Sequence, residues 1–127
     1  MNLWEKVTKI ANGAQIIRDW LGSGGIAVDR TLAQTRADTC LKCPCNKAGS
    51  GVTESVAAAI KEHVQFKNSM GLRVSGEKSL QQCSICLCSI RLKIWCPSEH
   101  IAAHTSEEEL AKFPELCWIG KEIRRTV

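Results

Sequence analysis

The stretch CSICLC at residues 83–88, with its counterpart CLKCPC at residues 40–45, decides how this chain is expected to fold. Both stretches have the spacing C-x-x-C-x-C, and the chain has eight cysteines in all. Two residues between a pair of cysteines allow a tight turn that points both thiolates at one ion. Two such turns supply the four thiolates that a tetrahedral structural zinc site requires. We therefore predict a first zinc site made of Cys40, Cys43, Cys83 and Cys86.

Four cysteines lie outside this predicted site, and they can form a second zinc site or a disulfide. They are Cys45, Cys88, Cys96 and Cys117. The sequence thus indicates one or two Zn²⁺ ions. An iron–sulfur cluster is the alternative cofactor, because four thiolates also suit it. His100 and His104 are spaced four residues apart and are candidates to replace one of these cysteines as a ligand.

The N-terminal segment, residues 2–21, has the apolar spacing of an amphipathic helix. Its apolar stripe consists of Leu3, Val7, Ile10, Ile17 and Leu21. Glycines at residues 22–25 follow as a predicted hinge, so we divide the chain into an arm at 1–25 and a cysteine-rich domain at 26–127. We predict that this stripe binds a protein partner or a second copy of the chain.

The remaining pattern predicts an α+β fold, with a small zinc-ribbon-like knuckle core, a short antiparallel sheet and three to four flanking helices. Asp29 is expected to cap a helix over 30–39, and Thr53 one over 53–70. Ser106 with Glu109 resembles a capping box for a helix that ends at Phe113. Alternation of apolar and polar residues predicts strands at 72–74 and 90–95.

Charge makes nucleic acid an alternative partner. The net charge is +4, and a strand at 90–95 would project Arg91 and Lys93 to solvent, with Lys121, Arg124 and Arg125 in a basic tail. Such scattered cations would give weak, salt-sensitive phosphate contacts. The sequence has no phosphate-binding loop or nucleophile elbow, and an all-thiolate zinc site has no open coordination position. We therefore predict a protein that is not an enzyme.

The sequence is expected to contain neither a signal peptide nor a membrane span. The first residues mix acidic and basic side chains where a signal peptide would be apolar, and no stretch is long and apolar enough for a membrane span. A reducing cytoplasm is therefore the expected site of synthesis. In that compartment closely spaced cysteines favour metal over disulfides.

The order of motifs resembles that of small cysteine-rich proteins encoded by tailed phages and prophages. The resemblance rests on NLW at residues 2–4, the two cysteine stretches, LKIW at 92–95 and CW at 117–118. It implies a phage context, with synthesis in the host cytoplasm and incorporation into the virion. It also implies that the first-site cysteines hold the metal, with Cys117 as a further candidate ligand, and that Cys45 and Cys96 are additions of this chain.

Overall fold

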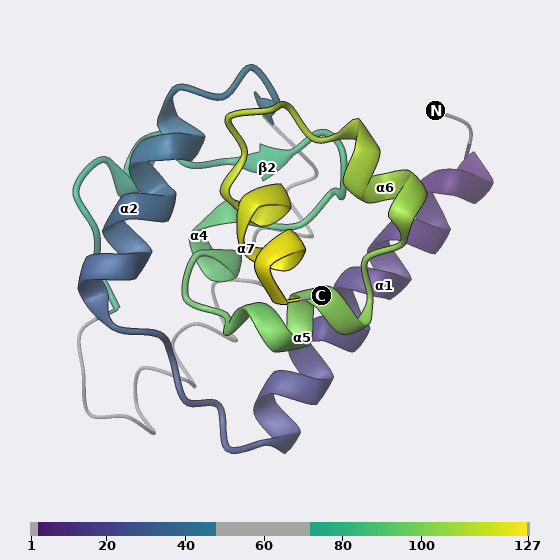
Figure 1. The fold of residues 1–127 in the computed structure, drawn as a ribbon, viewed down its shortest axis with the longest axis horizontal. Coiled ribbons are helices and arrows are strands. Elements are labelled where there is room, and N and C mark those ends of the chain that lie inside the picture. The colour runs from purple at the N-terminus through teal and green to yellow at the C-terminus, as the bar shows by residue number, and fades with distance from the viewer. Residues whose placement is uncertain (1–2, 48–71, 127) are drawn as a thin grey trace.

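The computed structural model describes residues 3–47 and 72–126, which form a mostly helical fold with one small sheet (Figure 1). The elements are α1 (Leu3–Gly22), α2 (Arg30–Leu41), β1 (Asn46–Lys47), the 3₁₀ turn η1 (Glu77–Ser79), β2 (Gln82–Cys83), α4 (Ile90–Lys93), α5 (Ser98–Ala103), α6 (Glu107–Lys112) and α7 (Trp118–Thr126). Helix α7 contacts α5 and α6, while α5 also contacts α1, and α2 contacts α4.

Three of the predicted helices are present in the structure as α1, α2 and α6. The Asp29 carboxylate accepts a hydrogen bond from the Leu32 N–H at 2.9 Å, and the Ser106 hydroxyl accepts one from the Glu109 N–H at 3.1 Å. These side chains satisfy N–H groups that have no partner within the helix, which is why the helices begin there. The predicted helix at 53–70 lies outside the described residues.

The short antiparallel sheet is confirmed, and it joins the two cysteine stretches. Strand β1 pairs with β2 in the register Asn46 opposite Cys83 and Lys47 opposite Gln82. The backbone N–H of Ser84 also donates to the Cys45 carbonyl at 2.8 Å. Segments that are far apart in the sequence are thereby held side by side at their cysteines. The mixture of helices with a small sheet matches the predicted class.

The prediction of a strand at 90–95 is wrong, because α4 occupies this segment. Ile90, Leu92 and Ile94 are buried, but so is the polar Lys93 between them, so the alternation of apolar and polar residues does not mark a buried and a solvated face here. Short apolar runs are ambiguous between helix and strand for this reason.

The other predicted strand and the number of helices also differ from expectation. Leu72 and Val74 are buried and Arg73 is exposed, as the alternation indicates, yet 72–74 is not part of a sheet. Six α-helices lie in the described residues rather than three to four, because α4, α5 and the helix α7 in the basic tail were not predicted as helices.

Helix α1 buries one face of its C-terminal half, whereas its N-terminal half is mostly exposed. Trp20 is 1% exposed, and its indole N–H donates to the Ile26 carbonyl at 2.9 Å across a turn in which Gly24 and Gly25 have φ of 109° and 67°. Positive φ favours glycine, which explains both residues. Among the predicted stripe, Ile17 and Leu21 pack against the core.

The start of α1 has a different environment. Leu3 and Trp4 are 78% and 77% exposed, and Val7 and Ile10 are also exposed. The division of the chain at residue 25 stays a prediction.

Three contacts attach α1 to the C-terminal part of the chain. The Lys9 ammonium donates to the Ile85 carbonyl, and the His104 ring contacts the Asp19 carboxylate. A Cβ placed on Gly13 would lie 3.2 Å from the Cys88 sulfur. Helix α1 therefore lies against the second cysteine stretch, and the glycine in its middle permits this close approach.

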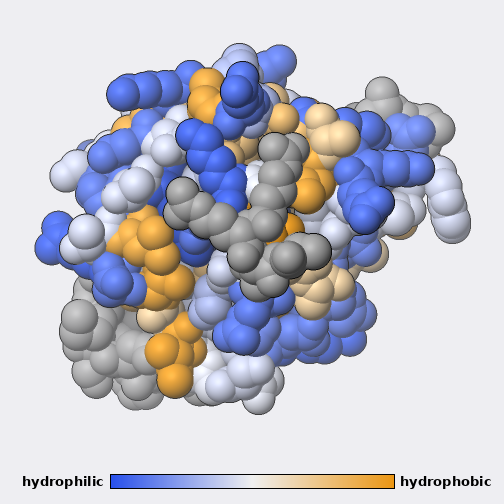
Figure 2. Space-filling model, in the orientation of Figure 1, coloured by the Kyte–Doolittle hydropathy of each residue, from blue (hydrophilic) through white to orange (hydrophobic). Residues whose placement is uncertain are grey.

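The surface in the orientation of Figure 1 is mostly hydrophilic, with separate hydrophobic patches (Figure 2). Among the described residues, no helix has the length and apolar character that crossing a membrane requires.

Candidate metal centre

The two cysteine stretches and the start of α7 enclose a small cavity of about 20 Å³. Five cysteines line it: Cys40, Cys43, Cys45, Cys83 and Cys117. Apolar side chains, among them Phe113 and Ile119, form most of the remaining wall, and Asn46 and Lys93 also line the cavity. This volume holds about one water-sized sphere. The cavity therefore has room for one small ion or one water molecule.

The other two cysteines of the second stretch lie beside this cavity. The Cys86 thiol is in hydrogen-bonding contact with both the Cys83 and Cys88 thiols. Cys86 is 3% exposed, so this contact is inside the protein. Seven of the eight cysteines thus form one continuous cluster.

The eighth cysteine, Cys96, is buried in a different place. Its thiol donates to the Pro97 carbonyl at 3.6 Å, and its charged neighbours are Lys93, Arg36 and Glu99. The residues of the expected second site, Cys45, Cys88, Cys96 and Cys117, are therefore not brought together.

Lys93 places a positive charge inside the cluster. Its side chain is 6% exposed, and its ammonium lies 3.2 Å from the Cys86 sulfur and 3.6 Å from the Cys88 sulfur. An isolated buried ammonium is strongly disfavoured, so its burial requires anionic partners. The expectation that Lys93 projects to solvent from a strand is wrong.

Arg91 is also engaged within the protein rather than displayed for a partner. Its guanidinium donates to the carbonyls of Glu77, Leu80 and Lys78 at distances between 2.9 and 3.1 Å. Lys121 lies on an exposed part of α7. Two of the cations proposed for phosphate contact thus have internal roles.

The pKa values follow from burial and from the contacts between thiols. Burial raises the pKa of Cys40 to about 11 and is also the main cause of the raised pKa values of Cys43 and Cys117. The Cys83 thiol donates to Cys86, which raises the pKa of Cys83 and lowers that of Cys86. A metal that binds here must displace thiol protons, so its binding depends on pH.

The pKa of Lys93 is also shifted by the thiols around it. Burial acts to lower the pKa of Lys93, but the negative charges of Cys86 and Cys88 outweigh it, so the pKa of this ammonium is raised above its usual value. The hydrogen bond to Cys86 and burial raise the pKa of Cys88, whereas the pKa of Cys86 is lowered, so Cys86 is the thiol of this pair whose ionised form the contacts favour.

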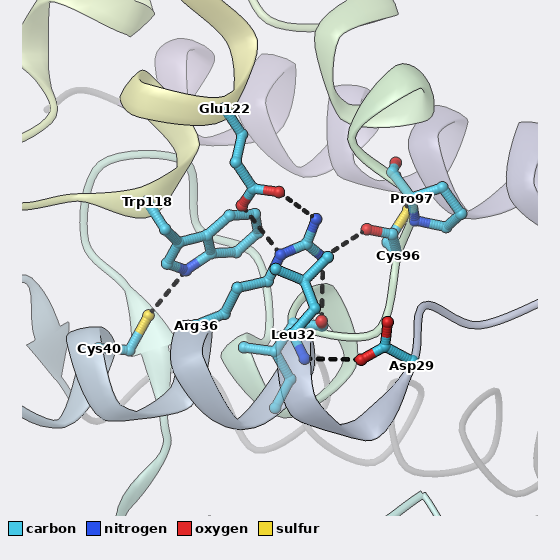
Figure 3. Close-up of polar contacts among 9 residues, drawn as sticks. Asp29, Leu32, Arg36, Cys40, Cys96, Pro97, Trp118 and Glu122 are labelled. Atoms are coloured by element: carbon cyan, nitrogen blue, oxygen red, sulfur yellow. Dashed lines mark hydrogen bonds and ion pairs between the residues drawn. The ribbon is translucent and has the colours of Figure 1, made fainter. Parts of the chain in front are cut away.

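A second N–H donor reaches the cluster from α7. The Trp118 indole N–H donates to the Cys40 sulfur at 3.2 Å (Figure 3). Burial removes water from this sulfur, and the indole supplies a hydrogen bond in its place.

Arg36 fixes the position of α7, and hence of Cys117 and Trp118, relative to α2. Its guanidinium makes a bidentate ion pair with Glu122 at 2.7 and 2.9 Å, and it lies 4.3 Å from the centre of the Trp118 ring. The same group donates to the carbonyls of Ile94 and Cys96 at 2.9 and 2.7 Å.

The roles of Arg36, Trp118 and Glu122 beside the cluster were not predicted from the sequence. The role of Arg36 could have been suggested by the sequence. It is a cation on a helix that otherwise faces the core, and such a cation needs a buried partner.

The cluster brings Cys40, Cys43 and Cys83 of the predicted first site to one cavity and places Cys86 against Cys83. All eight cysteines are free thiols. Within residues 3–47 and 72–126, no group of three or more potential ligand side chains is already arranged as a finished metal-binding set. The His100 ring lies 3.9 Å from the Glu99 carboxylate, and the His104 ring contacts the Asp19 carboxylate.

Comparisons with known proteins add no family to this description. No protein family, curated protein or solved structure matches the chain.

Proposed function

We propose that this chain is a non-enzymatic zinc protein in which thiolates of the cysteine cluster hold one region of the fold together. The observation that supports the proposal is the cavity of about 20 Å³ with five cysteines in its wall. These cysteines come from the end of α2, the segment leading into β1, strand β2 and the start of α7. An ion bound there would cross-link three regions that are distant in the sequence, at residues 40–45, 83 and 117.

The helices and strands around the cysteines are short, and this is why the fold would need such a cross-link. The sheet has two residues in each strand, and α4, α5 and α6 have four to six residues each. Helices this short are not stable alone and depend on tertiary contacts. A structural zinc contributes its binding energy directly to the folded state. We therefore assign the metal a structural role.

The test is to purify the protein without oxygen and measure metal content together with native mass. Zinc in the protein, followed by loss of helical circular dichroism on titration with a strong chelator, is the expected result. A protein that contains no zinc, takes up none and keeps its fold in chelator would refute the proposal. Iron with inorganic sulfide would replace zinc by the iron–sulfur alternative.

Cys43→Ser and Cys96→Ala form a matched pair of variants for this test. Cys43 lines the cavity, whereas Cys96 is buried away from it. Loss of zinc in the first variant and its retention in the second is the expected outcome. Equal zinc content in the two variants would contradict the cavity as the binding site.

For the biological role, we propose an interaction or assembly component, with the N-terminal half of α1 as the contact for a second copy or another protein. Leu3, Trp4, Val7 and Ile10 are exposed there within two turns or so of helix. Replacing Leu3, Val7 and Ile10 by Ser should leave stability unchanged and reduce the native mass measured by light scattering. A mass that is monomeric before and after the change would remove self-association.

The phage context rests on the resemblance in motif order, and we propose it on that basis. Mass spectrometry of purified virions tests it, because a virion component copurifies with the particle. Nucleic-acid binding is the weaker alternative, since Arg91 and Lys93 are engaged inside the protein. Absence of binding to duplex and single-stranded DNA at low salt would exclude that alternative.

A further inference from the structure

The seven clustered cysteines fall into groups with different binding partners. This inference rests on the zinc site proposed above. We infer that the chain binds one divalent ion, with four cysteines as its ligands, and that the Lys93 ammonium is the cation of the remaining pair of the second stretch. The four ligands, called the cavity set, are Cys40, Cys43, Cys83 and Cys117. The remaining pair, called the capped pair, is Cys86 and Cys88.

The cavity separates the two sets. Every member of the cavity set lines it, and neither member of the capped pair does. Cys117 enters this set from the start of α7, although the spacing of the two cysteine stretches had favoured Cys86 as the fourth ligand. Four thiolates complete a tetrahedral zinc site.

Cys45 also lines the cavity, as a fifth thiol for four coordination positions. The backbone N–H of Cys43 donates to the Cys40 carbonyl at 3.1 Å, so these two residues already form the tight turn that presents a chelating pair. Cys83 and Cys117 are both buried, whereas Cys45 is partly exposed and can remain hydrated as a thiol. We therefore leave Cys45 outside the ligand set.

Lys93 is the reason that the capped pair does not need an ion. Its ammonium is within hydrogen-bonding distance of both sulfurs of the pair, at 3.2 Å from Cys86 and 3.6 Å from Cys88. Lys93 also reaches the wall of the cavity, but the sulfurs to which its ammonium donates are those of the capped pair. One cation for each set of sulfurs satisfies both.

The hydrogen-bond donors to the two sets of cysteines differ in charge. The neutral indole of Trp118 donates to Cys40 in the cavity set, at 3.2 Å, and adds no positive charge next to the ion. The charged donor is directed at the capped pair. Outer-shell hydrogen bonds of this kind orient metal ligands and tune their basicity.

The primary test uses the wild-type chain loaded with ¹¹³Cd²⁺ as the probe, under anaerobic conditions. Proton–cadmium correlation spectra identify ligands directly, through the coupling between the metal and the β-protons of each bound cysteine. A single ¹¹³Cd signal correlated with the cavity set is the expected result. A second bound ion, or a correlation to Cys86 or Cys88, would overturn the inference while leaving the zinc proposal intact. Absence of bound cadmium would instead count against the zinc proposal itself.

Two serine variants provide an independent measurement by competition with a chromophoric chelator. Cys117→Ser should lower the zinc affinity by more than the roughly 10–100-fold expected for an outer-shell change. Cys86→Ser, from the capped pair, should lose no more than that range and keep a stoichiometry of one. The reverse order of the two losses would overturn the assignment. The cadmium spectrum of the wild type decides the matter even where a variant does not fold.

Discussion

Replacing Arg36 by Met tests how the C-terminal helix is held on the rest of the fold. Arg36 is 1% exposed and donates to the carbonyls of Ile94 and Cys96 as well as to Glu122. Met keeps much of the apolar stem but removes all of these hydrogen bonds. Leaving a buried acceptor unsatisfied costs about 1–3 kcal/mol, and breaking a buried ion pair by removing one partner costs about 3–5 kcal/mol.

The expected loss for Arg36→Met is therefore about 3–5 kcal/mol, which is a large part of the roughly 5–15 kcal/mol that stabilises a typical domain. Urea unfolding of the zinc-loaded protein, followed by tryptophan fluorescence, measures it. Trp118 stacks on the same guanidinium, so its fluorescence should also change in the native state of the variant.

Glu122→Gln is the matched control. The Glu122 side chain is 21% exposed, and a glutamine oxygen still accepts from Arg36, whose two carbonyl contacts stay in place. We expect a loss of about 1 kcal/mol, in the range of a single hydrogen bond. A loss for Arg36→Met below about 1 kcal/mol, or one that Glu122→Gln equals, would refute the reasoning that the buried carbonyls make Arg36 necessary.

Three further predictions concern the cysteine cluster and its surroundings. Gly13→Val should destabilise the protein by about 1–3 kcal/mol in urea unfolding, because its side chain would press on the Cys88 sulfur. An unchanged midpoint would mean that α1 shifts freely. Leu87 has φ of 60°, a left-handed conformation that a β-branched residue adopts poorly. Leu87→Ile should therefore lower thermal stability while Leu87→Gly is tolerated, and equal effects would contradict a backbone origin. Burial raises the pKa of Cys96 from 9.0 to about 12, so above pH 9 the unfolded chain loses this proton first and stability falls. The wild type should lose up to about 1.4 kcal/mol per pH unit more than Cys96→Ala when both are zinc-loaded, and parallel pH profiles would exclude the effect.

The local parts of the fold were predictable from sequence because their causes are local. Asp29 and Ser106 cap helices through contacts within three residues, and the two cysteine stretches meet at the predicted short sheet. Apolar periodicity identified α1. It did not show which half is buried, because burial depends on what lies opposite Trp20.

The non-local features were not predictable, since single-sequence patterns do not state which distant residues meet. Lys93 reads as a solvated cation in an alternating segment, but the thiols of Cys86 and Cys88 make its burial favourable. Arg36 and Glu122 are 86 residues apart in the chain. The helix over 90–93 was not predicted because the alternating pattern assigned Lys93 to solvent, whereas its side chain is buried against the two thiols.

The attachment of α1 has a consequence for the order of events during synthesis. The His104 ring that contacts Asp19 and the carbonyl that Lys9 reaches lie 85 and 76 residues further along the chain. Contacts of such large sequence separation close late in folding, and a nascent chain emerges from its N-terminus first. Trp20 and Ile16 therefore leave the ribosome well before the surface that covers them exists. During that interval these apolar side chains are open to capture by a chaperone or to aggregation with another nascent chain.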